Sequence, residues 1–354
     1  MHSCGNEKED TMKIQNIVLD ESRNARLTAI IQDVEGEYGK IVNRPAIIVM
    51  PGGAYWYCSD REAEPVAFAY AKAGFHVFIL RYAVGASRGW PYPLDEYEQT
   101  MELILQNQDE WHIMTDKIAV IGFSAGGHLA ATAATMGKHR PNAAILGYAV
   151  LNRELTDICQ KGMPYPVEEV DDETCPCFLF AARDDNMVDV SNTLQFQQAL
   201  WEKGIMFESH IYAYGQHGFS TADPTINTNP ICSRAANWVA DSIAWLGDIF
   251  GILTPEGMTE PACAAKYSGD NEGTLSVDCT LTHLRKQTGV AETVLKDVFA
   301  QLELGIEQLY GPMSETITGL VKRFKLKDLM KMANIPQASI DELNAVLIQI
   351  PNQR

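Results

Sequence analysis

Short apolar runs alternate with amphipathic stretches along most of the chain. Six runs are apolar at nearly every position, which is typical of strands buried on both faces of a parallel sheet: 46–50, 75–80, 118–121, 143–148, 178–182 and 210–214. Segments with helical spacing lie between and after them, at 64–72, 94–106, 126–135, 192–203 and 233–250. This alternation predicts an α/β sheet of about six parallel strands.

The chain before this pattern is different. Residues 14–19 and 27–31, joined by the polar sequence ESRNAR, predict a pair of antiparallel strands at the edge of the sheet. Residues 1–12 are polar, and we expect them to form a disordered lead-in. One α/β domain is therefore predicted over residues 13–252.

A second, smaller domain is predicted after residue 252. Residues 253–278 are rich in Pro, Gly, Ala and Thr and indicate a linker. Between residues 279 and 354 the sequence repeats with a constant offset of 45, so that Leu281, Leu284, Gly289, Val290, Leu295, Val298 and Leu302 match Leu326, Leu329, Asn334, Ile335, Ile340, Leu343 and Leu347. Each repeat predicts a helix, a left-handed turn at Gly289 or Asn334, and a second helix.

Helix-turn-helix units also occur in DNA-binding domains, which are basic. Residues 265–354 contain 10 Lys and Arg and 11 Asp and Glu, a net charge of −1. This balance favours a small all-α bundle used for homo-oligomerisation or as a wall over an active site. DNA binding is the alternative, and it would require duplex affinity that weakens steeply with salt.

The charge of the whole chain excludes some partners. A formal net charge of −18 opposes nucleic acid and anionic membranes and favours neutral or cationic small molecules. The chain begins without the apolar segment of a signal peptide and has no run of about 18 apolar residues, so we expect a cytoplasmic protein. The eight cysteines are scattered, which indicates reduced thiols. No cofactor and no metal ion is expected.

The sequence IGFSAGGH, residues 121–128, predicts a strand, a sharp turn and a helix. Within it Gly122, Ser124 and Gly126 form the pattern G-x-S-x-G, in which a strained turn presents a serine hydroxyl at the carboxyl edge of a sheet. Glycine is needed on both sides because strand and helix cross closely there. Ser124 is the predicted nucleophile.

Two other predicted strands end in residues that suit the same chemistry, and such ends meet at one edge of an open α/β sheet. Asp185 follows the run at 178–182, and His217 follows the run at 210–214. His217 would take the proton from Ser124 as the serine attacks, and the carboxylate would hold the imidazole in the required tautomer.

The turn after the run at 46–50 is rich in glycine and predicts donors for an oxyanion. Gly53 and Ala54 would supply two backbone amides, and Gly52 would give the turn its freedom. The amide of Ala125, directly after the nucleophile, would supply another.

Some of these assignments have alternatives. Asp184 and Asp189 lie close to Asp185 in sequence. Asp185 is preferred because the spacing D-x-x-V is matched from it to Val188, and Asp184 stays open as the acid. His128, four residues after the serine, is interpreted as a packing or hydrogen-bonding residue.

The motifs together resemble the carbohydrate-esterase-like branch of the α/β-hydrolases, which includes acetyl xylan esterases and feruloyl esterase-like enzymes. The resemblance covers about residues 13–250 and is carried by PGGAYWYCSDREAEPVAFAYAKAGFHVFILRY, GFSAGGHLAA, ARDDNMV and GQHGF. It implies hydrolysis of a small acyl ester, such as acetyl, from a sugar or a similar alcohol. Pro51 stands where hormone-sensitive-lipase relatives carry histidine, and Ala54 replaces the third glycine of the turn, where it would crowd the acyl side.

Aromatic residues near these turns are candidates for substrate contact. Tyr55 and Trp56 follow the glycine-rich turn, and Trp90 and Tyr92 lie in the loop after the run at 75–80. These residues could form an aromatic rim that binds the flat faces of sugars or aryl groups. Alternatively, they could pack as ordinary residues in the wall of the site.

The stretch between residues 149 and 177 predicts a small cap. It contains Tyr165 and an acidic run at 168–173, which would be either a solvated loop or a negative lip that discourages anionic substrates.

Two further functions remain open, because a serine, a histidine and an acid do not by themselves separate esters from amides. One is a peptidase or amidase, and the other is a lipase-like carboxylesterase without carbohydrate specificity. A binding protein with a relic triad is disfavoured, because all members of the triad and the oxyanion turn are present.

Overall fold

The computed structural model describes residues 12–159, 161–227, 230–310 and 324–353, and it contains two compact units, Met1–Ala265 and Lys266–Arg354. The predicted lead-in falls on residues 1–11, outside the described residues. The predicted boundary at residue 12 differs from the structure by one residue, because Met12 begins strand β1 (Met12–Asp20) and pairs with Gln32. Backbone pairing with the neighbouring strand extends the edge strand to this residue.

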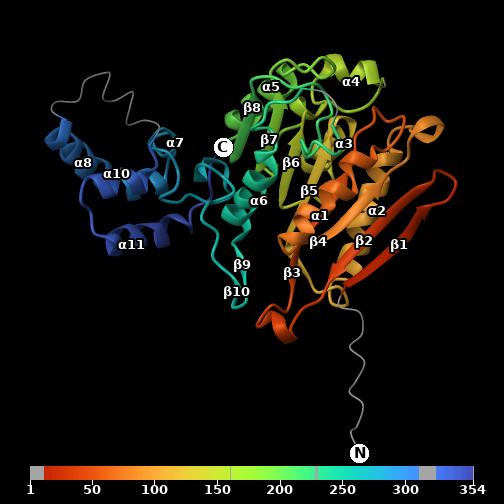
Figure 1. Cartoon of the computed structure of the whole chain (residues 1–354). Helices are drawn as coiled ribbons and strands as arrows, with labels where there is room; N and C mark the ends of the chain where they lie inside the picture. The colour runs from red at the N-terminus through yellow and green to blue at the C-terminus, as the bar shows by residue number, and fades with distance from the viewer. Residues whose placement is uncertain (1–11, 160, 228–229, 311–323, 354) are drawn as a thin grey trace, which may run out of the picture. The chain divides into compact units, whose positions relative to one another are not determined.

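The larger unit contains an eight-stranded sheet in the order β1-β2-β4-β3-β5-β6-β7-β8 (Figure 1). The remaining strands are β2 (Ala25–Gln32), β3 (Arg44–Met50), β4 (His76–Arg81), β5 (Ile113–Phe123), β6 (Ala143–Gly147), β7 (Cys177–Ala182) and β8 (Phe207–Tyr212). The β1–β2 and β2–β4 pairs are antiparallel, and all other pairs in this sheet are parallel. The prediction of an α/β sheet with six parallel strands and an antiparallel start is confirmed.

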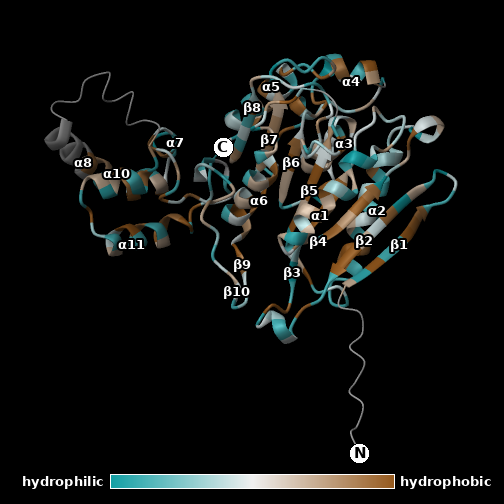
Figure 2. Ribbon diagram, viewed as in Figure 1, coloured by the Kyte–Doolittle hydropathy of each residue, from teal (hydrophilic) through white to brown (hydrophobic). Residues whose placement is uncertain are grey.

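Helices cover both faces of this sheet because successive residues of its inner strands point to opposite sides. In β3, Ile48 belongs to one hydrophobic core, whereas Ile47 and Val49 belong to the other. Figure 2 shows the hydrophobic colour along the strands. The first core is covered by α2 (Tyr92–Gln106), α3 (Ser124–Met136) and α5 (Ser191–Glu202), and the second by α1 (Glu64–Lys72) and α6 (Asn237–Phe250).

Parallel pairing places the carboxyl ends of β3, β5, β7 and β8 at one edge of the sheet. Met50 at the end of β3 pairs with Gly122 of β5, and Ala182 at the end of β7 pairs with Tyr212 of β8. The turns that follow these strands carry the candidate residues. The segment between β6 and β7 adds helix α4 (Arg153–Cys159) at this edge.

The smaller unit contains α7 (Leu281–Leu284), α8 (Val290–Tyr310), α10 (Leu326–Met332) and α11 (Gln337–Leu347) around a hydrophobic core of its own. Gly289 and Asn334 have φ values of 71° and 55°, the left-handed backbone predicted for the two turns. The repeats pair through a bridge between Thr280 and Lys325, which occupy equivalent positions. None of the described helices in either unit is both long enough and apolar enough to cross a membrane.

The predicted linker at 253–278 contains the boundary between the units. Its first part forms a short hairpin of β9 (Leu253–Thr254) and β10 (Gly257–Met258), which belongs to the larger unit. This segment therefore has regular structure where the composition indicated only a connection.

Candidate active site

Ser124 occupies a sharp turn between β5 and α3. It directly follows the last residue of β5 and has a φ of 50°, in the left-handed region that non-glycine residues rarely adopt. A Cβ on Gly122 would lie 2.1 Å from the carbonyl oxygen of Gly126, and a Cβ on Gly126 would lie 2.1 Å from the carbonyl oxygen of Met50. The two glycines of the motif are therefore needed because backbone passes within contact distance of each.

The structure brings Ser124, His217 and Asp185 together. His217 Nε2 lies 2.9 Å from Ser124 Oγ, and His217 Nδ1 lies 2.8 Å from Asp185 Oδ2. A carboxylate only accepts hydrogen bonds, so Nδ1 carries the ring proton and Nε2 presents its lone pair to the serine hydroxyl. In this tautomer the imidazole is ready to accept the serine proton.

The carboxylate of Asp185 is fixed by its own turn. Its Oδ1 accepts the backbone N–H groups of Met187 and Val188, each at 2.9 Å, and its side chain is fully buried. Asp184 is exposed and has another partner, since its Oδ1 accepts the N–H of Gly215 at 2.7 Å, two residues before the histidine. Of the two candidate acids, Asp185 contacts His217 and Asp184 holds the loop that carries it.

The glycine-rich turn after β3 has a strained backbone next to the serine. Gly53, Ala54 and Tyr55 have φ values of 130°, 53° and 61°. A Cβ on Gly52 would lie 3.0 Å from Ser124 Cβ, so the start of this turn packs directly against the nucleophile. The N–H of Gly52 donates to the carboxylate of Glu62 at 2.8 Å. The amides of Gly53 and Ala54 therefore remain the candidate oxyanion donors on this turn.

Sequence analysis missed Glu62, which lies in the acidic sequence Asp60 to Glu64. It is 3% exposed, and its Oε1 accepts the hydroxyl of Tyr148 at 2.6 Å. The Tyr148 hydroxyl in turn accepts the N–H of Ser220 at 3.0 Å, and the Tyr148 ring packs edge-on against His217 with centroids 5.0 Å apart. Asp60, Glu62 and Glu64 are closely spaced acids, and no periodicity of the sequence indicates which of them is buried. Glu62 could therefore not be predicted from the sequence.

Tyr55 lies in the core and not at a rim. It is 1% exposed, and its hydroxyl lies 2.8 Å from His128 Nδ1. His128 Nε2 lies 2.9 Å from the carbonyl oxygen of Pro164, so Nε2 carries the proton and Nδ1 accepts the Tyr55 hydroxyl. Burial lowers the pKa of His128 to about 4, which keeps it neutral. The interpretation of His128 as a hydrogen-bonding residue is confirmed, and Tyr55 belongs to the wall.

The other candidate aromatic residues differ in exposure. Trp56 is 61% exposed, and the guanidinium of Arg88 lies over its ring at 3.8 Å. Trp90 is partly buried, and its ring packs edge-on against His128. Tyr92 is exposed at the start of α2 beneath the guanidinium of Arg23. Trp56 and Tyr92 therefore keep a surface for contact with a ligand.

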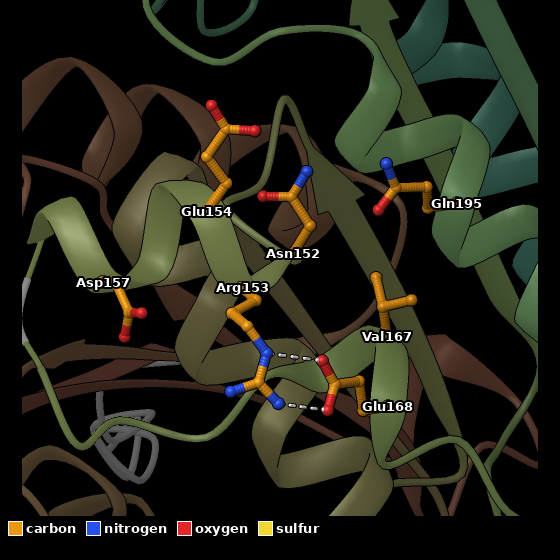
Figure 3. Close-up of a pocket in the computed structure, with 7 residues that line it drawn as sticks. All are labelled: Asn152, Arg153, Glu154, Asp157, Val167, Glu168 and Gln195. Carbon is orange, nitrogen blue, oxygen red and sulfur yellow. Dashed lines mark hydrogen bonds and ion pairs between the residues drawn. The ribbon is translucent and has the colours of Figure 1, made fainter.

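The segment between β6 and β7 borders an open cavity of about 450 Å³ (Figure 3). The cavity is lined by Asn152, Arg153, Glu154, Asp157, Val167, Glu168 and Gln195. Figure 3 shows the guanidinium of Arg153 directed at the carboxylate of Glu168, with two hydrogen bonds of 3.1 and 2.7 Å. Arg153 also lies 4.0 Å above the ring of Tyr165, whose hydroxyl donates to Asp157 at 2.8 Å. Both contacts of Tyr165 are therefore with residues of the same segment between β6 and β7.

The acidic run at 168–173 is largely paired. Besides the pair made by Glu168, Asp171 receives two hydrogen bonds from Arg140, at 2.5 and 2.8 Å, and Asp172 lies 4.0 Å from Lys203. Hydrogen bonding from Arg140 lowers the pKa of Asp171. Three of the five acids of the run thus hold the segment against the neighbouring chain, whereas Glu169 and Glu173 are exposed. An effect of the run on anionic substrates stays a prediction.

Two family models match the larger unit. One, described as BD-FAE, matches residues 32–145, and the other, the dienelactone hydrolase family, matches residues 90–250. Among individual sequences, the chain is similar to an endo-1,4-beta-xylanase B of Butyrivibrio fibrisolvens. The two are 27% identical over 218 residues, which cover 51% of this chain and 33% of that protein. The chain is also similar to an acetylxylan esterase of Xylanibacter ruminicola, with 27% identity over 216 residues. This alignment covers 55% of this chain and 45% of that protein. The chain thus spans a third to less than a half of these relatives.

Matches to solved structures cover about two thirds of this chain and nearly all of the matched chains. MGS-M1, an α/β hydrolase enzyme from a Medee basin deep-sea metagenome library, is 38% identical with a TM-score of 0.62, and the match covers 68% of this chain and 98% of that one. An acetyl ester-xyloside bifunctional hydrolase from Caldicellulosiruptor lactoaceticus is 26% identical with a TM-score of 0.58, covering 67% and 96%. The chain belongs to the α/β-hydrolase family.

Proposed function

We propose that the protein is a serine esterase that removes acetyl or other short acyl groups from a sugar or oligosaccharide. The observation that carries the proposal is the continuous chain of hydrogen bonds from Ser124 Oγ through His217 to Asp185, at 2.9 and 2.8 Å. Such a chain makes an otherwise weakly nucleophilic hydroxyl reactive toward a carbonyl.

In the first half of the reaction, Ser124 Oγ attacks the ester carbonyl and its proton moves to His217 Nε2. Asp185 stabilises the imidazolium through the bond to Nδ1. The amides of Gly53, Ala54 and Ala125 would bind the oxyanion of the tetrahedral intermediate, and their preorganisation lowers the barrier because no reorientation is needed. The imidazolium then returns the proton to the departing alcohol, which leaves an acyl-serine.

In the second half, His217 takes a proton from water, and the resulting hydroxide attacks the acyl-serine carbonyl. Collapse of this intermediate returns the proton to Ser124 Oγ and releases the carboxylic acid. Each turnover thus consumes one ester and one water molecule and needs no further reactant.

Three observations support a short acyl group and a sugar alcohol. Ala54 stands in the oxyanion turn where the family resemblance leads one to expect glycine, and its methyl group would narrow the acyl side. The sequence and structural relatives include proteins named acetylxylan esterase and acetyl ester-xyloside hydrolase. The overall negative charge also favours a neutral glycoside over an anionic one.

The test compares wild type with Ser124→Ala on 4-nitrophenyl acetate, on acetylated xylo-oligosaccharides and on an acetyl anilide. We expect Ser124→Ala to lose activity by about a millionfold, to the detection limit. Ser22→Ala is the matched control, because Ser22 lies in the exposed turn between β1 and β2, where its hydroxyl bonds Asp20. Equal rates in wild type and Ser124→Ala would rule out the serine mechanism, and a preference for the anilide would make the protein an amidase.

A further inference from the structure

A buried carboxylate joins the two turns that flank the serine. Glu62 accepts the N–H of Gly52 on the oxyanion turn at 2.8 Å through one oxygen and the hydroxyl of Tyr148 at 2.6 Å through the other. Tyr148 continues the connection to the N–H of Ser220, three residues after His217, at 3.0 Å. The oxyanion turn and the histidine loop are therefore linked through one side chain.

Both oxygens of Glu62 act as hydrogen-bond acceptors, which suits an ionised carboxylate. The amide of Gly52 donates to one oxygen and the hydroxyl of Tyr148 to the other, while the Tyr148 oxygen accepts the N–H of Ser220. Burial raises the pKa of Glu62 above its ordinary value, and the bonds from Tyr148 and Gly52 counteract part of that rise.

The charges around Glu62 point toward the histidine. His217 and Arg61 are the positive groups that lower the pKa of Glu62, and the guanidinium of Arg61 bonds the carbonyl of Ile226 and the side chain of Asn227. The other titratable groups close to Glu62 are the buried hydroxyls of Tyr148 and Tyr82. The positive groups near the buried carboxylate are thus Arg61 and, once it takes up the serine proton during the reaction, the imidazolium of His217.

We propose that Glu62 is a positioning residue for ester hydrolysis: it holds the oxyanion turn and the histidine loop at a fixed separation, and its charge stabilises protonated His217. The proposal rests on the serine esterase function proposed above. A carboxylate in this place can act on both charges that form in the reaction, since it anchors the turn that carries the candidate oxyanion amides and is linked through Tyr148 to the loop of His217.

The main test is Glu62→Gln, which keeps the size of the side chain and removes its charge. One amide oxygen cannot accept from both Gly52 and Tyr148, so one bond of the link is lost. We expect kcat to fall by about 10- to 100-fold with KM within about twofold, because misplaced groups act on the transition state. The acid limb of kcat/KM should move to lower pH by about half a unit, because His217 loses a nearby negative charge.

Thermal unfolding separates positioning from stability. Removing a buried charge relieves its desolvation, but the donor that loses its acceptor costs about 1–3 kcal/mol, so we expect Glu62→Gln to lower the melting temperature no more than its control does while it loses activity well below that temperature. Glu96→Gln is the matched control: Glu96 is also a buried glutamate that accepts a backbone N–H, from Ala83 at 2.6 Å, and it bonds Arg23. We expect that control to lose stability and to keep kcat and the pH profile.

Tyr148→Phe provides a second test that does not depend on the folding of the first variant. It removes the hydroxyl that connects Glu62 to Ser220 and leaves the bond to Gly52, so kcat should fall while the acid limb stays in place. Wild-type kcat and an unchanged acid limb in Glu62→Gln would overturn the proposal, as would wild-type kcat in Tyr148→Phe. Ser124→Ala in the same assay keeps the two proposals distinct, because activity that survives in it contradicts the esterase mechanism itself.

Discussion

The turn after β3 and the turn after β7 both bring groups to the serine, but they are held in different ways. The first, at 51–62, has three successive residues with positive φ and is anchored by distant parts of the chain. His128 bonds Tyr55, and the hydroxyl of Tyr82 donates to the carbonyl of Pro51 at 2.6 Å. In the second turn, at 183–189, the carboxylate of Asp185 is held by N–H groups of the turn itself.

This difference follows from what each turn delivers. Amides that bind an oxyanion must be aimed by the backbone itself, and a strained backbone persists only where surrounding groups over-determine it. A carboxylate is positioned by its side chain. The side chain of Asp185 is held because it accepts the N–H groups of the residues two and three positions further on. Long-range anchors therefore shape the first turn, and short-range bonds suffice for the second.

The largest expected effect concerns the second turn. Asp185→Asn should lower kcat/KM for 4-nitrophenyl acetate by about 10⁴-fold, because the amide can present its NH₂ group to Nδ1 and favour the wrong tautomer of His217. The fold should remain, since the side chain keeps its size and its carbonyl oxygen can still accept from the turn. Stopped-flow or steady-state hydrolysis measures the loss.

Asp184→Asn is the matched variant, because it makes the same change one residue earlier. Its amide oxygen can still accept the N–H of Gly215, and we expect a rate within about threefold of wild type. If Asp184→Asn were the more damaging of the two, the acid would act through Asp184 and the turn would not be anchored as described.

The distinction between local and distant anchors also explains what the sequence could predict. The spacing D-x-x-V identified Asp185 because it reflects a bond from Val188 N–H back to the carboxylate. The turn at Ser124 and the six parallel strands could also be predicted from the sequence, because each depends on residues that are close together in the chain. Glu62 and the packing of Tyr55 were not, since their partners Tyr148 and His128 lie 86 and 73 residues away.

A smaller effect is expected when the pH is lowered. It changes the stability of the protein through His128, which anchors the first turn. The pKa of His128 is about 4 in the folded protein and about 6.5 when unfolded, so the unfolded chain binds the proton first as the pH falls. The contribution of His128 to stability is therefore present above pH 6.5 and is lost as the pH falls toward 4, by about 2 kcal/mol between pH 7 and pH 5. Urea unfolding at the two pH values measures this change.

His128→Gln is the variant that isolates this contribution. His76 is also buried with a pKa of about 4 and bonds the N–H of Gln32, so wild type should lose stability from both histidines. The variant should keep only the part that comes from His76. An unchanged dependence on pH in His128→Gln would mean that the Tyr55 anchor does not depend on a neutral histidine.

The smallest effect is expected from Ala54→Gly. Ala54 has a φ of 53°, which glycine adopts without strain, so the substitution should stabilise the fold by about 1 kcal/mol or leave it unchanged. If Glu62 and His128 set the shape of the turn, kcat for the acetyl ester should stay within about twofold. Loss of the methyl group should raise the rate for butanoyl relative to acetyl esters by about three- to tenfold, because one methylene in a pocket counts for about 1 kcal/mol. A tenfold loss of acetyl hydrolysis would instead show that the turn depends on the stiffness of its own residue and not on its distant anchors.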